Sequence, residues 1–231
     1  MNQLKILNEE IVRCTLCPRL VEHREIMARV KRRAYQEETY WGRPVPGFGD
    51  PRGRLLLIGL APGAHGANRT GRVFTGDRSG DFLYRALFEA GFASQPESVG
   101  VDDGLVLRDA YISAAVRCAP PDNKPSPLEI STCRNYLLRE IELLPNVRVV
   151  MALGRLAFDS YLRVLKDTGS IGSRSGFAFG HGNAHRFDKL LPVLVSSYHP
   201  SQQNTSTGRL TKAMMQEVFG TVRSLIREAE G

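Results

Sequence analysis

Four short apolar runs, separated by amphipathic segments, constrain the fold of this chain more than any other feature. The runs are RLLLIGL, AYISAAV, VRVVMAL and PVLVSS, at residues 54–60, 110–116, 147–153 and 192–197. Amphipathic segments that predict helices lie at 81–90, 128–144, 156–165 and 210–228. Strands that are apolar throughout and alternate with helices indicate a parallel sheet covered on both faces. We therefore expect an α/β chain, a three-layer αβα arrangement with a central four-stranded parallel sheet.

The remaining segments are less regular. Two apolar stripes predict helical structure over residues 3–34, with an interruption at 14–18. Residues 40–53 hold Trp41 among several Gly and Pro, which is typical of a structured connector. Residues 168–189 are Gly-rich and polar and are interpreted as a small hairpin.

Length and charge limit the class of protein. A chain of 231 residues with ordinary globular composition fits one domain, here residues 1–231. No uncharged apolar run reaches about 18 residues, and the first residues lack the apolar core of a signal peptide, so we expect a cytoplasmic protein with no membrane partner. The net charge of +7 favours a polyanionic partner such as nucleic acid, although an Arg-rich proteome would explain it equally well.

The loops that follow three of the predicted strands have unusual compositions. They read APGAHGAN at 61–68, RCAPPDN at 117–123 and YHPSQQN at 198–204. In an open parallel sheet these loops share one edge, where ligands bind. The sequence therefore predicts a polar binding site at that edge.

Several chemistries are excluded by missing motifs. The chain has no P-loop, no dinucleotide-binding glycine pattern, no zinc-deaminase signature, no nuclease-like carboxylate cluster and no nucleophile elbow. Four residues of the edge loops remain as candidates: Phe74, Asp77, Asn123 and His199. Each has a structural alternative, as core aromatic, helix cap, turn residue or loop cap respectively. Their convergence on one edge favours a functional site.

The four cysteines of the chain form two pairs, Cys14 with Cys17 and Cys118 with Cys133. Four thiolates suit zinc or an iron–sulfur cluster, and unligated buried thiols are the alternative. The long second spacing and Pro18 directly after Cys17 favour a [4Fe–4S] cluster. In either case the metal would attach the N-terminal arm to the loop after the second strand.

Several long motifs in one order resemble the family 5, or type B, branch of the uracil-DNA glycosylase superfamily. They are GLAPGAHGANRTGR at 59–72, FTGDRSG at 74–80, HPSQQN at 199–204, PGFGDP at 46–51 and RCAPPDNKP at 117–125, together with the four cysteine positions. The resemblance implies excision of a deaminated base from DNA. It also implies a four-stranded parallel sheet between helices and a structural [4Fe–4S] cluster held by Cys14, Cys17, Cys118 and Cys133.

Two departures from related branches bear on mechanism. Other branches place an acidic or amide side chain at the position of Ala64 to hold the hydrolytic water, and the resemblance points instead to Asn123, with Asp77 as a second polar contributor. The related type A branch reads uracil with an Asn where this chain has Ala114 and Ala115. The loss of that side chain predicts a loose pocket that also accepts hypoxanthine or xanthine.

The resulting hypothesis is a monofunctional glycosylase in base excision repair that acts on double-stranded DNA as a monomer. Phe74 would stack on the flipped base, the backbone N–H groups of Gly63 and Ala64 would donate to its carbonyls, and His199 would stabilise its negative charge. Residues entering the minor groove or contacting phosphates would be Ser201, Gln202, Gln203, Asn204 and Arg209.

Two functions of other classes remain open on the sequence. A non-catalytic nucleic-acid-binding protein with a structural zinc would hold zinc and release no base. An enzyme acting on a free nucleotide or small amide would be indifferent to DNA.

Overall fold

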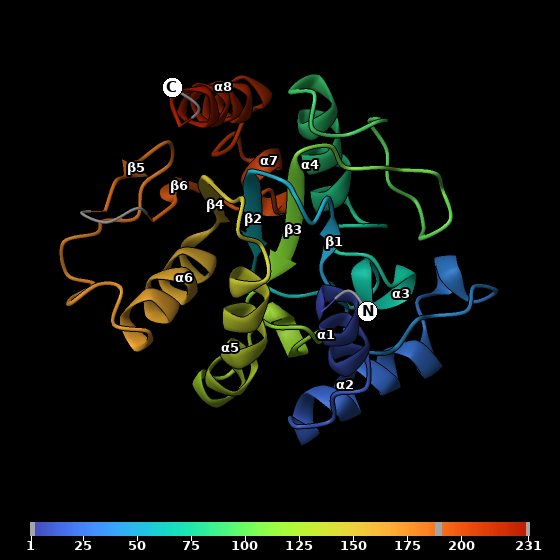
Figure 1. Cartoon of the computed structure of the whole chain (residues 1–231). Helices are drawn as coiled ribbons and strands as arrows, with labels where there is room; N and C mark the ends of the chain where they lie inside the picture. The colour runs from blue at the N-terminus through green and yellow to red at the C-terminus, as the bar shows by residue number, and fades with distance from the viewer. Residues whose placement is uncertain (1–2, 188–190, 230–231) are drawn as a thin grey trace.

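Six strands form one mixed sheet in the computed structural model, which describes residues 3–187 and 191–229 (Figure 1). Their order across the sheet is β1-β3-β2-β4-β6-β5. The strands are β1 (Phe48–Gly49), β2 (Leu55–Gly59), β3 (Ala110–Ala114), β4 (Val149–Leu153), β5 (Ala184–His185) and β6 (Val193–Ser197).

The four apolar runs form the parallel centre of this sheet, as predicted. In the register of β2, Leu55 lies opposite Ala110 of β3 and Val149 of β4, and Val149 lies opposite Val193 of β6. The predicted number of strands was wrong, because an antiparallel two-residue strand is added at each edge. Residues 40–53 supply β1 and residues 168–189 supply β5. The last two residues of the second segment, 188 and 189, lie outside the described residues.

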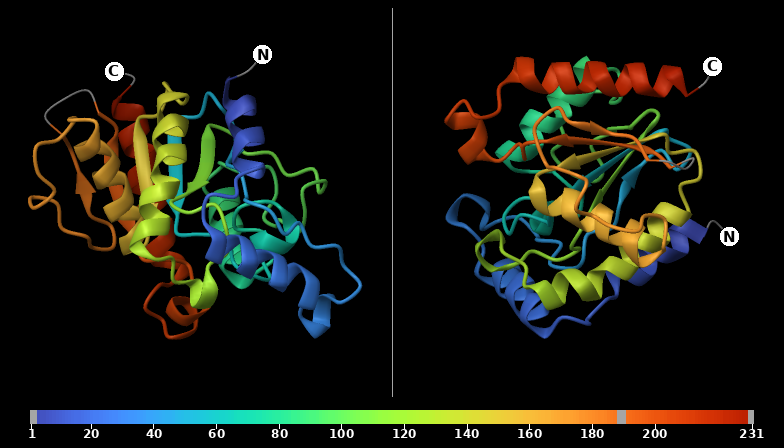
Figure 2. Two further views of the ribbon diagram at one scale, coloured as in Figure 1. Left: turned by 90° about the horizontal axis from the view of Figure 1, so that it is seen from below. Right: turned by 90° about the vertical axis from the view of Figure 1, so that its left-hand side faces the viewer.

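Helices cover both faces of the sheet (Figure 2). The helices are α1 (Gln3–Val12), α2 (Pro18–Val30), α3 (Ala67–Thr70), α4 (Arg78–Glu89), α5 (Pro127–Glu142), α6 (Arg155–Asp167), α7 (Gln202–Ser206) and α8 (Lys212–Glu228), with 3-10 turns η1 (Arg33–Tyr35) and η2 (Pro121–Asn123). None of the described helices combines the length and apolarity that a membrane span requires. The predicted 3–34 region is thus two helices, because residues 14–17 form an open turn that carries two cysteines.

Alternation along each strand divides the buried side chains between two cores. Leu55, Leu57 and Met151 face the core under α4 and α8, whereas Leu56 and Val150 face the core under α1, α5 and α6. Successive side chains of a strand point to opposite faces, so a continuously apolar strand supplies both layers. The predicted three-layer arrangement is therefore present around the central strands.

A buried ion pair links the sheet to α5 on the second face. Arg117, three residues after the end of β3, donates to Glu140 of α5 at 2.6 Å, and both side chains are almost fully buried. Glu140 also accepts from the hydroxyls of Tyr111 and Ser113 in β3. The network fixes the start of the loop that carries Cys118 and Asn123.

Candidate active site

A cleft of about 1000 Å³ opens at the edge of the sheet where the parallel strands end. Gly59 ends β2, Ala114 ends β3, and His199 follows β6 by two residues; all three line the cleft. The shared edge follows from parallel topology, which places the carboxyl ends of neighbouring strands together.

Nearly all of the residues predicted for the site line this cleft. Asn204 and Arg209 are the exceptions: the Asn204 amide donates to the His199 carbonyl at 2.8 Å, and the Arg209 guanidinium lies 4.8 Å from the centre of the Tyr198 ring. The predicted residues that line it are Gly63, Ala64, Phe74, Asp77, Asn123, His199, Ser201, Gln202 and Gln203.

Phe74 and His199 form the aromatic part of the cleft. Their ring centres are 5.8 Å apart, with planes inclined by 32°. Phe74 has a φ of 52°, and a Cβ at Gly59 would lie 2.6 Å from its ring, so glycine at position 59 makes room for it. A Cβ at Gly154 would lie 3.2 Å from the Cβ of His199, and a φ of 97° also favours glycine there.

Burial lowers the pKa of His199 to about 4. The imidazole is therefore neutral near pH 7 and can donate a hydrogen bond through one ring nitrogen. A neutral imidazole of this kind can stabilise negative charge on a leaving group by donating its one N–H hydrogen bond.

The loop between β2 and α3 lines the cleft and contains backbone N–H groups without a protein acceptor in the described structure. Within the described part of the chain, those of Gly63, Ala64 and His65 donate to no protein acceptor. The loop is closed by the Gly63 carbonyl, which accepts from Gly66 and Asn68 at 3.2 and 3.0 Å. Such a fixed loop can bind the carbonyl oxygens of a ligand through its free N–H groups.

Asp77 lies beneath this loop and also begins α4. Its carboxylate accepts from the Gly80 N–H at 3.0 Å, so it is the N-cap of the helix. A Cβ at Gly63 would lie 2.9 Å from its other oxygen, and one at Gly66 would collide with it. Burial raises the pKa of Asp77, opposed by the N–H groups of Gly80 and Ser79. Asp77 therefore caps α4, the structural alternative considered from the sequence, and also lines the cleft.

Asn123 reaches the cleft from η2 and is exposed at its mouth. Asn123 and Asp122 have φ angles of 56° and 53°, in the left-handed region that Asn and Asp tolerate best among non-glycine residues. Asn123 thus lines the same cleft as Phe74 and His199.

Sequence reasoning missed the contribution of the N-terminal arm to the cleft. His23, Met27, Arg32 and Tyr35 line it, although the basic run at 29–33 is more typical of a solvated surface. His65 also lines it, and the Tyr40 hydroxyl lies 3.0 Å from its Nδ1.

Arg69 connects that arm to the loop after β2. Its guanidinium lies 3.9 Å from the centre of the Tyr35 ring, pairs with Glu38, and donates to the carbonyls of His65 and Gly76, each at 2.9 Å. Arg69 belongs to the motif at 59–72, but no pattern in the sequence indicates these partners.

The four cysteines line one small cavity on the second face of the sheet. Sulfur atoms there accept hydrogen bonds: Arg24 donates to Cys118 at 3.1 Å, and the Arg117 backbone N–H donates to Cys133 at 3.3 Å. Over residues 3–187 and 191–229, no three His, Cys, Asp or Glu side chains converge as a single bound ion requires. Four thiols around one cavity are a donor set that both zinc and iron–sulfur clusters use.

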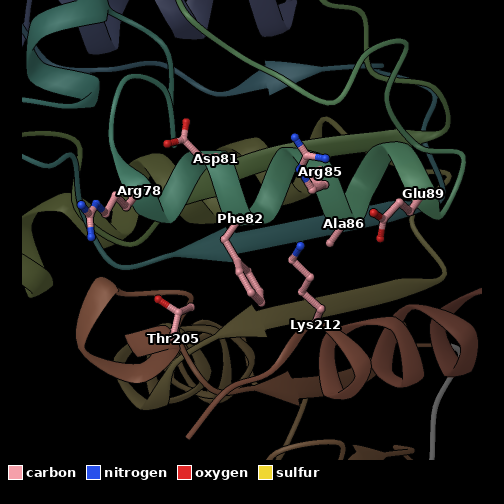
Figure 3. Close-up of a pocket in the computed structure, with 8 residues that line it drawn as sticks. All are labelled: Arg78, Asp81, Phe82, Arg85, Ala86, Glu89, Thr205 and Lys212. Carbon is pink, nitrogen blue, oxygen red and sulfur yellow. The ribbon is translucent and has the colours of Figure 1, made fainter. Parts of the chain in front are cut away.

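A second groove, of about 240 Å³, adjoins the cleft between α4 and the α7–α8 segment (Figure 3). Arg78 lines both the groove and the cleft. Phe82 and Lys212 point toward each other across the groove. The lining residues are Arg78, Asp81, Phe82, Arg85, Ala86, Glu89, Thr205 and Lys212.

Comparisons with known proteins agree with the motifs. Residues 46–223 match the uracil DNA glycosylase superfamily. A Type-5 uracil-DNA glycosylase of Thermus thermophilus is 52% identical, over 94% of this chain and 95% of the relative. A second, of Mycobacterium bovis, is 50% identical over 95% of this chain and 80% of the relative. A Type-4 uracil-DNA glycosylase of Archaeoglobus fulgidus is 32% identical over 77% of this chain and 79% of the relative. The chain therefore belongs to the uracil-DNA glycosylase superfamily and, within it, to the type-5 branch.

Proposed function

We propose that this chain excises uracil from DNA by hydrolysis of the glycosidic bond and leaves an abasic site for base excision repair. The observation that carries the proposal is the meeting of Phe74, Asn123 and His199 in one cleft, on a chain whose type-5 relatives are named uracil-DNA glycosylases. The net charge of +7 agrees with a DNA substrate.

The base must first leave the stack, because its glycosidic bond is inaccessible within a duplex. Flipping costs a few kcal/mol and least at a mismatch such as U·G. Phe74 then stacks on the base, and the free N–H groups of Gly63 and Ala64 donate to its carbonyls. The backbone donors are rigid because the Gly63 carbonyl closes their loop.

Bond cleavage transfers the electron pair of the C1′–N1 bond to the base. The sugar becomes oxocarbenium-like, and neutral His199 donates a hydrogen bond to the oxygen of the departing uracil anion. A preorganised donor of this kind contributes about 3–4 kcal/mol in comparable sites.

Water completes the reaction at C1′ and loses a proton to the solvent or the departing base. Asn123 holds this water, since Ala64 has no polar side chain. Asp77 supplies negative charge beside the sugar, and its buried carboxylate is held by the Gly80 N–H.

We also propose that the pocket accepts hypoxanthine or xanthine. Ala114 lines the cleft at the end of β3 and offers no side-chain hydrogen bond to discriminate uracil. A site without a side chain that hydrogen-bonds the edge of the base discriminates weakly between uracil and related bases.

The four cysteines are proposed to hold a structural [4Fe–4S] cluster. Cys14, Cys17, Cys118 and Cys133 line one cavity that joins the α1–α2 turn, the loop after β3 and α5. When bound, the cluster would supply a structural link rather than reaction chemistry. Cysteines that form no disulfide also agree with the proposed reducing, cytoplasmic location.

Double-stranded DNA is the proposed partner of a monomeric enzyme. Ser201, Gln202 and Gln203 line the cleft next to His199 and would fill the space left by the flipped base. Asn204 instead holds the His199 carbonyl, so its contribution to DNA binding is through that loop. Arg209 is exposed beside Tyr198 and available to a phosphate.

The test is release of uracil from a duplex with one U·G pair, in EDTA, followed by alkaline cleavage. We expect strand cleavage only after alkali, and at least about 100-fold slower release by Asn123→Ala. Asp122→Ala is the matched control, because Asp122 shares the exposure and backbone conformation of Asn123.

Three results would change these assignments. Undiminished release by Asn123→Ala would remove the water-holding role of Asn123 and keep the function. No release from U·G, hypoxanthine or xanthine pairs by a protein that holds zinc would favour a non-catalytic DNA-binding protein. Turnover of free nucleotides with indifference to DNA would favour a small-molecule enzyme.

A further inference from the structure

The backbone around His199 is held by side chains on both sides. The Tyr198 N–H donates to Nδ1 of His181 at 3.2 Å, and the Tyr198 carbonyl accepts from the Ser197 hydroxyl at 3.0 Å. The His199 carbonyl accepts from the Asn204 amide at 2.8 Å. Strand pairing ends at Ser197, so these bonds replace the sheet ladder at the point where the imidazole enters the cleft.

His181 comes from the segment between α6 and β6 and does not line the cleft. Its ring stacks on the Tyr198 ring, with centres 5.0 Å apart and planes inclined by 29°. The neighbouring Gly182 N–H donates to the Ser196 carbonyl at 2.8 Å, which fastens the same segment to β6.

The contacts of His181 define its tautomer. A backbone N–H can only donate, so Nδ1 must be the unprotonated nitrogen of the ring. Nε2 then carries the proton, and it lies 3.4 Å from the Met214 carbonyl in α8. His181 thus bridges the end of β6 and the first turns of α8.

We propose that His181 is a positioning residue for His199: its Nδ1 fixes the Tyr198 peptide and thereby the place of the His199 imidazole in the cleft. The inference rests on the proposed function. A displacement of about 1 Å in a reacting group can slow a reaction about 100-fold. Loss of the hydrogen bond between His181 and the Tyr198 N–H is therefore expected to reduce the rate of base release without reducing the affinity for DNA.

Two variants separate hydrogen bonding from ring packing. His181→Asn keeps an acceptor attached to Cγ, where the histidine carries Nδ1, and removes the ring. His181→Phe keeps a ring for Tyr198 and removes the acceptor. A structural role for the ring alone would make the Asn variant the more damaging one.

The experiment measures single-turnover uracil release from a U·G duplex, the Kd for a duplex with an abasic site, and amide exchange of the peptide that contains Tyr198. We expect His181→Phe to release uracil about 10- to 100-fold more slowly, with a Kd within about twofold of wild type and faster exchange. His181→Asn should stay within about threefold of the wild-type rate.

Wild-type release by His181→Phe, or equal loss in both variants, would overturn the inference. If the wild-type protein releases no base, the proposed function fails and amide exchange decides the inference by itself. Protection lost in His181→Phe and kept in His181→Asn would support it, whereas equal protection in both would overturn it.

Discussion

Phe74 and Asn123 of the candidate site, and Asp122 beside Asn123, adopt backbone conformations that residues other than glycine rarely adopt. Phe74, Asp122 and Asn123 have φ angles of 52°, 53° and 56°. Such conformations cost on the order of 1–3 kcal/mol each and persist where the surroundings determine them. Phe74 is held against Gly59, and the Asn123 N–H donates to the Pro120 carbonyl at 3.2 Å. The fold thus stabilises a preformed cleft.

The protonation of His199 predicts a pH-dependent stability. Burial lowers its folded-state pKa to about 4, below the value near 6.5 expected in the unfolded chain. The unfolded state therefore binds more protons between about pH 6.5 and pH 4, and stability falls as the pH falls through that window. We expect His199→Asn to reduce the loss of unfolding free energy between pH 7 and pH 4 by up to about 3 kcal/mol.

Urea denaturation of both proteins at the two pH values measures this difference. The carboxyl groups contribute to both proteins alike and cancel in the comparison. Equal pH dependence in the two proteins would show that His199 is protonated as readily in the folded state as in the unfolded chain.

Among the helices and strands, α4 begins with a residue that both stabilises the helix and lines the cleft. Asp77 caps α4 through the Gly80 N–H and lies beneath the Gly63–Gly66 turn. The same carboxylate is the second polar group proposed for the reaction. Its two roles can be separated, because Asn also accepts the capping hydrogen bond but carries no charge.

Substitution of Asp77 tests this separation. We expect Asp77→Ala to reduce the free energy of unfolding by about 1 kcal/mol through loss of the cap, and Asp77→Asn to retain most of it. If the charge contributes to catalysis, both variants release uracil more slowly under single turnover. Wild-type activity of Asp77→Asn would leave the residue with its capping role alone.

The N-terminal arm is the element whose packing depends most on the cysteine cavity. Cys14 and Cys17 lie in the turn between α1 and α2, and Cys118 and Cys133 lie beyond β3 and in α5. A cluster bound there would hold parts of the chain that are far apart in sequence. Its loss is expected to loosen α1 and α2 first.

Cys17→Ser is expected to lose bound iron and sulfide and to lower the Tm by at least about 4 °C, equivalent to 1–2 kcal/mol for a chain of this size. Limited proteolysis should then cut within the first 40 residues or so. Thr15→Ala, in the same turn, is the control. Stoichiometric zinc without sulfide in the wild-type protein would contradict the cluster.

Across the whole molecule, cationic side chains lie at the edge of the sheet where the cleft opens. Arg32 lines the cleft from the N-terminal arm, and Arg78 lines both the cleft and the adjoining groove. Within the described residues, the side chains of Arg78, Arg85 and Lys212 make no hydrogen bond or close ion pair. Asp81 lies near Arg78 and Arg85 and offsets part of their charge. Because Arg78 lines both the cleft and the groove and Lys212 extends into the groove, we expect these two cations to contact DNA phosphates.

The salt dependence of DNA binding tests this placement. A contact with one phosphate contributes about 0.9 to the slope of log K against log salt. We expect Arg78→Gln and Lys212→Gln each to reduce the slope by about one, with a uniform loss of affinity across sequences. Arg227→Gln removes the same charge from the far end of α8 and should leave the slope unchanged. If Arg78→Gln and Lys212→Gln both kept the wild-type slope, the DNA path would lie elsewhere.

Much of the architecture was predictable from local patterns. Continuous apolar runs indicated the parallel strands, and the amphipathic segment at 128–144 indicated α5, whose first turn is closed by reciprocal capping bonds between Ser126 and Glu129. The edge strands β1 and β5 were not predicted as strands, because two residues give no periodicity and their pairing depends on neighbours remote in sequence. The helix α7 within 201–208 was also not predicted, since its five polar residues show no apolar stripe.

Local patterns were enough to predict the parallel centre of the sheet, the edge at which the site lies and the loops that supply most of the cleft, because strand direction and loop order follow from the chain. The packing of distant segments brings Arg32 and Tyr35 of the N-terminal arm to the cleft and His181 against Tyr198. These contacts join segments far apart in sequence. No local pattern encodes them, since they depend on how the layers pack against the sheet.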